Sequence, residues 1–175
     1  MPPVHWQPLR QRDGITCGPT VAIVAAAHLD ADYAARLAAP EWFAAEQGRL
    51  HRRLNRCWPR ALGTTPMAMA AALSAHSAVR YRWRWARRRD PLLDVREAVL
   101  LGWPVPMLVG NVAPRHWVLL TQWRDDGFAC YEPSSGQTRR VTIAQVRGAE
   151  LVGLGFARPW AFVLPARLSG RLSGR

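Results

Sequence analysis

Cys17 is the residue of this chain best suited to nucleophilic chemistry, because it stands where an irregular segment turns into a helical pattern. Residues 11–20 read Gln-Arg-Asp-Gly-Ile-Thr-Cys-Gly-Pro-Thr and run straight into the apolar residues 21–27. A helix start offers unpaired N–H groups and about half a positive charge, which favours a thiolate over a thiol. Gly18 keeps the backbone beside the sulfur slim. Pro19 fits the first helical turn, where its missing N–H costs nothing.

A base and an orienting carboxylate for such a thiol follow in the second half of the chain. His116 opens the apolar strand pattern His-Trp-Val-Leu-Leu, and Glu132 ends a second strand pattern before Pro-Ser-Ser-Gly. Residues 124–127, Arg-Asp-Asp-Gly, predict a hairpin turn between them, with the glycine where positive φ is needed. Antiparallel pairing brings His116 and Glu132 near each other but not directly opposite, so their contact needs a bulge or a flanking position. Cysteine, histidine and carboxylate suggest a nucleophile, its base and the group that orients the base.

These motifs resemble the C39-like branch of the papain-like cysteine peptidases, over roughly residues 8–146. The resemblance is carried by Gln six positions before Cys-Gly-Pro, a His-Trp strand, and a strand ending in acid-Pro-x-x-Gly. It implies that Cys17 is the nucleophile, His116 the general base and acid, Glu132 the orienting carboxylate and Gln11 an oxyanion-hole donor. The family usually has Asp, or Asn in the wider papain-like group, where this chain has Glu132. A small backbone shift can absorb the extra methylene.

The function expected from this set is thiol-dependent hydrolysis of a peptide or amide bond through an acyl-enzyme. Two alternatives stay open: an acyltransferase or deamidase on the same scaffold, and an inactive papain-like binding module with a basic surface. Transporter-fused members of the family carry membrane and nucleotide-binding parts. This chain reads as a free-standing domain, so the leader-peptide substrate of those members is not carried over. The expected partner is a peptide or protein substrate.

The order of elements predicts an α+β architecture, a papain-like fold in which an N-terminal helical part packs on a C-terminal antiparallel sheet. Residues 1–165 are expected to form one domain, and residues 166–175 an Arg/Ser/Gly tail. Helices are predicted at 18–29, 30–39, 41–58, 66–76, 92–101 and 142–147, and strands at 79–86, 104–109, 116–123, 128–132, 139–143 and 160–164. Pro40 is expected to end a helix, Thr65 to cap one, and Asp90-Pro91 to open one. Pro104 and Pro106 predict an edge or irregular strand.

Cysteine usage and the absence of targeting signals exclude several classes. The three cysteines show no C-x-x-C spacing, so the sequence indicates no zinc site and no disulfide framework. We expect no cofactor. Cys57 and Cys130 are expected to be structural thiols, and His28, His51 and His76 to be surface or helix-end residues. The sequence has no apolar stretch long enough to span a membrane, and its first residues do not resemble a signal peptide. We therefore expect a cytoplasmic protein that does not associate with a membrane.

Arginine dominates the charge. The formal net charge is +12, and all 24 basic residues are arginine, a bias typical of a GC-rich coding background. The charge weakly favours acidic partners. Arginines cluster at 49–60 and 80–89, and the second cluster alternates with aromatic residues. That alternation favours a strand with aromatics inward and arginines outward over a nucleic-acid surface.

Overall fold

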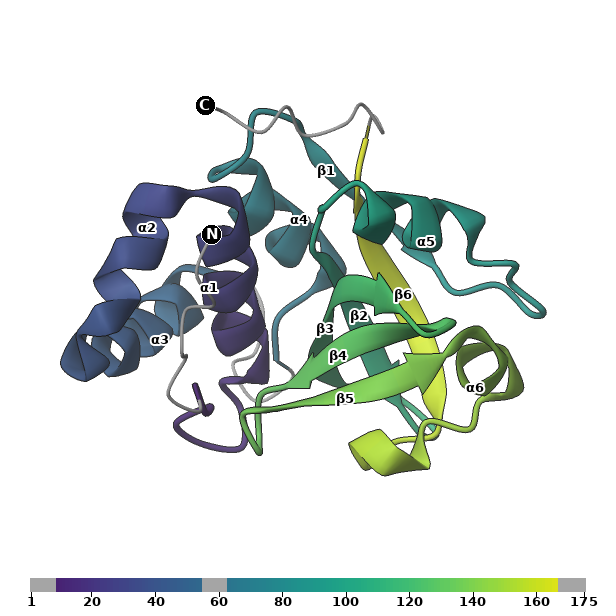
Figure 1. Cartoon of the computed structure of the whole chain (residues 1–175). Helices are drawn as coiled ribbons and strands as arrows, with labels where there is room; N and C mark the ends of the chain where they lie inside the picture. The colour runs from purple at the N-terminus through teal and green to yellow at the C-terminus, as the bar shows by residue number, and fades with distance from the viewer. Residues whose placement is uncertain (1–8, 55–62, 167–175) are drawn as a thin grey trace.

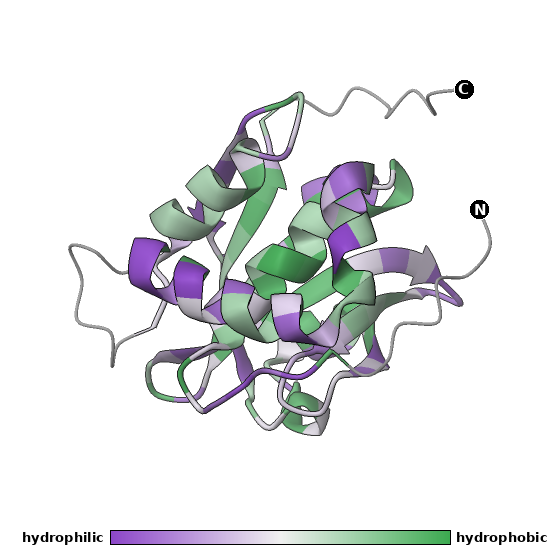
Figure 2. Ribbon diagram, turned by 90° about the vertical axis from the view of Figure 1, so that its left-hand side faces the viewer, coloured by the Kyte–Doolittle hydropathy of each residue, from purple (hydrophilic) through white to green (hydrophobic). Residues whose placement is uncertain are grey.

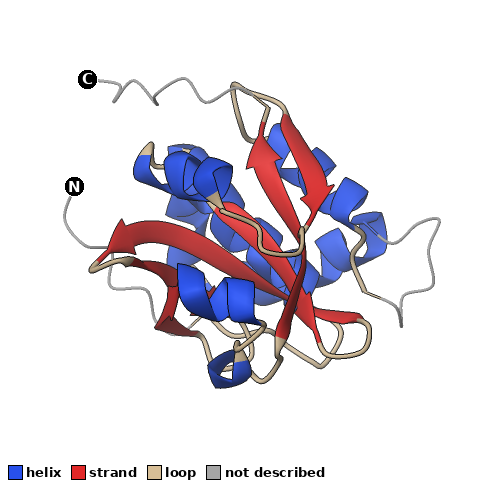
Figure 3. Cartoon of the chain, turned by 90° about the vertical axis from the view of Figure 1, so that its right-hand side faces the viewer, coloured by secondary structure: helices blue, strands red, loops and turns tan. Residues whose placement is uncertain are grey.

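A six-stranded antiparallel sheet with helices on both faces forms the frame of the molecule. The structure is a computed structural model, and it describes residues 9–54 and 63–166. Figure 1 shows α1 to α4 on one side of the sheet and α5 and α6 on the other, and Figure 3 shows the sheet from the α6 side. The helices are α1 (Cys17–Leu29), α2 (Ala31–Ala35), α3 (Pro40–Leu54), α4 (Pro66–Ser74), α5 (Leu93–Leu100) and α6 (Ile143–Gly148), with 3-10 turns η1 (Arg36–Ala38) and η3 (Val152–Leu154). The strands are β1 (Tyr81–Trp85), β2 (Val105–Gly110), β3 (Pro114–Arg124), β4 (Gly127–Glu132), β5 (Gln137–Thr142) and β6 (Arg158–Pro165). The α+β class is therefore confirmed.

Helix α1 is the centre of the core. Every residue from 17 to 27 is buried, because the helix is apolar on all sides and rich in alanine, so neighbours can approach it closely. It contacts α3 and α4 on one side and strands β2 and β3 on the other. In Figure 2 the ribbon of α1 is mostly green, whereas the end of α3 that precedes the grey segment is purple.

The strand order of the sheet is β1-β6-β2-β3-β4-β5. Of the two alternatives expected for residues 104–109, the edge position is wrong, because β2 lies between β6 and β3, and the irregular start is confirmed. Both prolines are tolerated because pairing with β6 begins only at Met107, beyond Pro104 and Pro106. Strand β6 also lies inside the sheet, next to β1, so β1 and β5 form the edges.

The hairpin between β3 and β4 turns at residues 124–127, as expected, but the positive φ values fall on other residues than Gly127. Asp125 and Asp126 carry the positive φ values, 49° and 56°, while Gly127 begins β4. Two successive left-handed residues make a turn whose twist matches the flanking strands, and aspartate tolerates that conformation better than most residues.

Helix boundaries are confirmed at some positions and wrong at others. Thr65 caps α4 by accepting the Ala68 N–H at 3.2 Å, as expected. The helical segment before Pro40 ends at Ala38, as expected, and Pro40 also begins α3, which suits a residue that has no N–H to donate. Asp90 does not cap α5: its carboxylate holds a turn by accepting the N–H groups of Arg87 and Leu92, and Leu92 is the N-cap residue.

Strand β1 only partly follows the expected alternation of aromatic and basic residues. Tyr81 is buried and Arg82 exposed, but Trp85 is exposed and Arg84 is half-buried. The Arg84 guanidinium is drawn inward by ion pairs with Asp90 and Asp94, at 2.6 Å each, and lies over the ring of Phe162. Charge pairing explains this departure from the pattern.

Some expectations fall outside the described residues, namely those for Cys57, for residues 55–58 of the third predicted helix and for the tail from residue 167 onward. Among the helices of the described part, none is both long and apolar enough to cross a membrane.

Candidate active site

Cys17 is the first residue of α1 and lies against the loop before α4 and against strand β3. It is only 4% exposed. A Cβ added at Gly18 would stand 2.2 Å from Thr64 Oγ1 and 3.3 Å from Trp117 Cδ1, so only glycine allows this approach. The Trp117 indole N–H donates to the carbonyl of Thr64 at 2.9 Å. Trp117 thus packs beneath the start of the helix, as expected.

The thiol of Cys17 faces the backbone next to His116. Burial raises the pKa of this thiol, whereas the backbone N–H groups of Trp117, Gly18 and Cys17 itself lower it, and the charge of Glu132 raises it again. Together these effects raise the pKa of the Cys17 thiol. The N–H groups at the helix start lower the pKa of Cys17, as expected, but desolvation of the sulfur outweighs them, so the thiolate is not favoured in this structure.

His116 and Glu132 form a direct hydrogen bond, 2.8 Å between Nε2 and Oε1, and both residues are buried. A carboxylate accepts only, so the ring carries its proton on Nε2 and leaves the lone pair of Nδ1 for another partner. The contact expected from the hairpin is therefore confirmed.

A β-bulge in β3 makes this bond possible. Leu120 pairs with Cys130, but the next pair towards the turn joins Gln122 to Ala129, so Thr121 is the extra residue. Beyond the bulge, Leu119 pairs with Tyr131 and Leu120 with Cys130. If this register continues by one residue, Glu132 lies opposite Val118, on the same face of the sheet as His116. Without the bulge Glu132 would lie opposite Leu119, on the other face. The bulge thus decides whether the carboxylate reaches the imidazole.

The turn after β4 holds Glu132 in its ionised form. Oε1 accepts the Ser134 N–H at 2.7 Å and Oε2 accepts the Ser135 N–H at 2.8 Å. Burial raises the pKa of this carboxyl, but these bonds and the one to His116 outweigh burial and lower it to about 2. Burial lowers the pKa of His116, and Glu132 only partly opposes that effect. Near neutral pH the site therefore rests as thiol, neutral imidazole and carboxylate.

Phe156, from the loop between η3 and β6, covers the imidazole. Its ring stacks on that of His116 with 5.2 Å between the centroids and 23° between the planes. The aromatic cover contributes to the burial that keeps the ring neutral. No motif connects Phe156 with the site, and sequence reasoning missed it.

Gln11 lies beside the Glu132 turn. Its Nε2 donates to the Asp13 carbonyl at 2.6 Å, its Oε1 accepts the Ser134 hydroxyl at 3.3 Å, and its backbone N–H donates to the Pro133 carbonyl at 2.8 Å. The side-chain amide has a second N–H beyond the one given to Asp13. The Asp13 side chain forms a turn by accepting the Ile15 N–H at 3.1 Å.

Gln47 of α3, which sequence reasoning also missed, ties the Gln11 segment to the Cys17 helix. Its Oε1 accepts the Arg12 N–H at 2.8 Å and the Thr20 hydroxyl at 3.0 Å, and its Nε2 donates to the Arg10 carbonyl at 3.2 Å. The side chain is 2% exposed. One buried amide therefore fixes both neighbours of Gln11 against the first turn of α1.

The other thiols and imidazoles of the described residues lie apart from this constellation. Cys130 is fully buried in β4, and burial raises its pKa far above the usual range. His76 pairs with Asp30 at 3.1 Å, and His51, expected at the surface or at a helix end, lies in the last turn of α3 and is buried. Across residues 9–54 and 63–166, no group of three or more His, Cys, Asp or Glu side chains could hold a metal ion.

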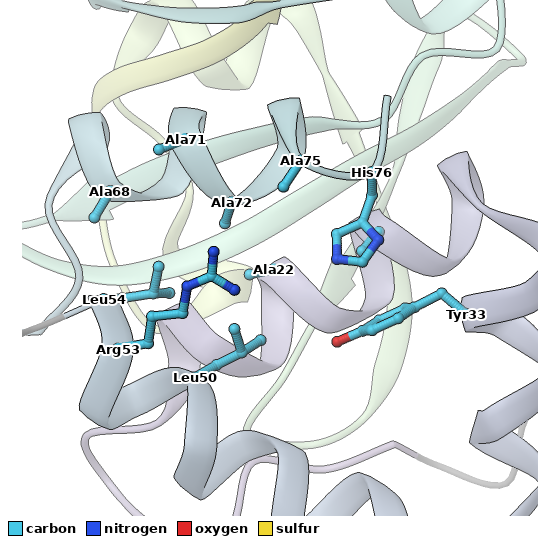
Figure 4. A pocket seen from close by; sticks show the side chains of 11 residues that line it. Ala22, Tyr33, Leu50, Arg53, Leu54, Ala68, Ala71, Ala72, Ala75 and His76 are labelled. Carbon is cyan, nitrogen blue, oxygen red and sulfur yellow. The ribbon is translucent and has the colours of Figure 1, made fainter. Parts of the chain in front are cut away.

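A cavity of about 200 Å³ lies elsewhere, between α1, α3 and α4 (Figure 4). Its walls are mostly alanine, with Tyr33 and His76 at one end and Arg53 reaching across from α3. The lining residues are Ala22, Ala26, Tyr33, Leu50, Arg53, Leu54, Ala68, Ala71, Ala72, Ala75 and His76. Small side chains on two facing helices leave this space unfilled.

Comparison with known proteins places the fold. No protein-family model matches the chain, and no curated protein matches it. Among solved structures, it is similar to the peptidase domain of Streptococcus ComA, a bi-functional ABC transporter involved in a quorum-sensing pathway. The TM-score is 0.54 at 17% identity, over 92% of this chain and 99% of that domain. The chain therefore has the fold of that peptidase domain, which agrees with the architecture expected from the sequence.

Proposed function

We propose that this chain is a cysteine hydrolase that cleaves a peptide or amide bond through Cys17, His116 and Glu132. The observation that carries the proposal is the buried bond between His116 and Glu132, beside a thiol that faces the next peptide of the same strand. The fold shared with a peptidase domain supports the same class of reaction. A buried structural histidine has no need of a carboxylate that is itself held by two backbone N–H groups.

In the proposed reaction the neutral pair is the starting state. As Sγ bonds to the substrate carbonyl carbon, Nδ1 of His116 takes the thiol proton, and Glu132 stabilises the resulting imidazolium. The oxyanion is stabilised by the Cys17 backbone N–H and by the second N–H of the Gln11 amide. His116 then gives its proton to the leaving amine as the C–N bond breaks, and water releases the acyl group. An amine in place of water gives acyl transfer.

Thiol labelling tests this proposal. Iodoacetamide at pH 7 is expected to modify Cys17 in preference to Cys130, because, of these two thiols of the described residues, Cys17 faces the backbone next to His116, whereas Cys130 is fully buried in β4. His116→Ala is expected to slow the modification of Cys17 at least tenfold. Mass spectrometry of the same sample follows both thiols, and Cys130 is the internal reference because it should stay unmodified in both proteins. Equal rates in the two proteins would overturn the proposal.

A second candidate, an inactive binding module on the same scaffold, is favoured by one observation. The pKa of Cys17 is raised and that of His116 lowered, mainly by burial in both cases, so the resting pair carries no ionised thiol. A scaffold predicts slow labelling of Cys17 that His116→Ala leaves unchanged. The labelling experiment therefore decides between the two candidates.

A further inference from the structure

Next to the candidate site lie arginines for which the described residues provide no acidic partner. Arg10 directly precedes Gln11, Arg115 directly precedes His116, and both side chains are exposed. Within the described parts of the chain, neither forms an ion pair with a carboxylate. Arg10 Nε donates to the Ser135 carbonyl at 2.9 Å, which fixes this guanidinium beside the Glu132 turn.

A second bulge places Arg115. Val109 pairs with His116, but the next residue, Gly110, pairs with Pro114, so Arg115 is the extra residue of β3. A bulged residue leaves the regular alternation of the strand, and bulges beside functional sites often redirect a side chain. Arg158, also exposed, pairs with Gly110 from β6 and so lies at the same end of the sheet.

Two carboxylates next to the site are already engaged. Glu132 is buried and bonded to His116. Asp13 accepts the Ile15 N–H and lies 3.6 Å from the Arg12 guanidinium, which balances its charge. Neither of them therefore pairs with Arg10, Arg115 or Arg158, whose charges are positive.

We propose that the substrate of this site is an acidic peptide segment, with carboxylates on the residues that flank the scissile bond. This inference rests on the proposed function, because it describes what approaches Cys17. Several unpaired guanidinium groups around a partly buried site raise the local concentration of anions and speed their association, an effect that falls with ionic strength. They also form bidentate bonds with carboxylates.

The test compares an anionic with a neutral reagent at the same sulfur. Iodoacetate and iodoacetamide are each used to label Cys17 in 20 mM and in 500 mM NaCl, in the unaltered chain, in Arg115→Glu and in Arg88→Glu. Arg88 is exposed in the loop after β1, three strands from β3, so its reversal changes net charge equally without touching the site. The readout is the ratio of the iodoacetate rate to the iodoacetamide rate, which cancels any change in intrinsic thiol reactivity.

In Arg115→Glu at low salt the ratio is expected to fall severalfold, because the substitution changes the charge beside His116 by two units. The fall should shrink at high salt, and Arg88→Glu should leave the ratio within about twofold. Equal ratios in the three proteins would overturn the acidic-substrate inference while the proposed function stands. Failure of both reagents to label Cys17 in a His116-dependent way would overturn the proposed function itself. The same comparison with Arg10→Glu keeps the inference testable if Arg115→Glu does not fold.

Discussion

Glu132→Gln should remove a pH-dependent part of the stability of this protein. In the folded chain the pKa of Glu132 is lowered from 4.5 to about 2, because the hydrogen bonds from Ser134, Ser135 and His116 outweigh burial. A difference of about 2.5 units corresponds to roughly 3 kcal/mol in the free energy of unfolding, at about 1.36 kcal/mol per unit. Because the folded pKa is the lower one, this contribution is complete above pH 4.5 and disappears as the pH falls towards 2.

The loss of this stability contribution can be measured at two acidic pH values. Of the roughly 3 kcal/mol, about 0.4 kcal/mol should be lost by pH 4.5 and about 1.4 kcal/mol by pH 3.5, from the linkage between proton binding and folding. Asp30, Glu46 and Asp90 also have lowered pKa values, so the unaltered protein loses more than this in total. Glu132→Gln shares those other losses, but it also lowers the pKa of His116 further, so the difference between the two proteins reports Glu132 together with His116.

Urea unfolding followed by tryptophan fluorescence at pH 7, 5.5, 4.5 and 3.5 measures that difference. Glutamine keeps the length of the side chain but presents an NH₂ group to a site built from donors, so the variant should be less stable at pH 7 by about 2–3 kcal/mol. The gap should narrow by more than 1 kcal/mol between pH 7 and pH 3.5. A gap that stays constant over this range would refute the conclusion that Glu132 is ionised in the folded protein.

Three further substitutions test the surroundings of the site. Gly18→Ala forces a methyl group against Thr64 and should cost about 1–3 kcal/mol in urea unfolding while also slowing thiol labelling, and an unchanged midpoint would contradict the close approach described above. Gln47→Leu keeps most of the volume but frees the segment around Gln11, so turnover of a peptide substrate should fall through kcat, about tenfold, with KM nearly unchanged. A change in KM alone would assign Gln47 to substrate binding. Ala72→Leu should fill part of the helical cavity and raise the free energy of unfolding by about 0.5–2 kcal/mol, whereas a loss would show that the cavity cannot accept the side chain.

The parts of the site that depend on local chemistry could be predicted from the sequence. The Gly18-Pro19 pair and the apolar run after Cys17 predicted a helix start, and α1 begins at Cys17. The β3–β4 hairpin followed from alternation and turn composition, because both signals act over a few residues. The fold class followed from the order of helical and strand patterns.

The parts that depend on long-range pairing could not be predicted. The place of β2 inside the sheet is set by β6, which lies about fifty residues later, and the prolines of β2 suggested the opposite position. Gln47 and Phe156 reach the site only through tertiary packing, and a lone glutamine or phenylalanine carries no sequence signal of that kind. The pKa of Cys17 was misjudged for the same reason, because burial is a property of the whole fold.

Burial and catalysis are compatible in this site if charge appears only when substrate is present. The thiol and the imidazole each avoid the cost of an isolated buried charge by staying neutral, while Glu132 is ionised because three donors hold it. That carboxylate stabilises an imidazolium more than an imidazole, so it assists the state in which His116 has taken the thiol proton. A substrate that brings an acyl carbon to the sulfur supplies the driving force for that transfer. Loss of the Glu132 carboxylate should therefore raise the activation free energy for acylation of Cys17 by more than it lowers the free energy of unfolding at neutral pH.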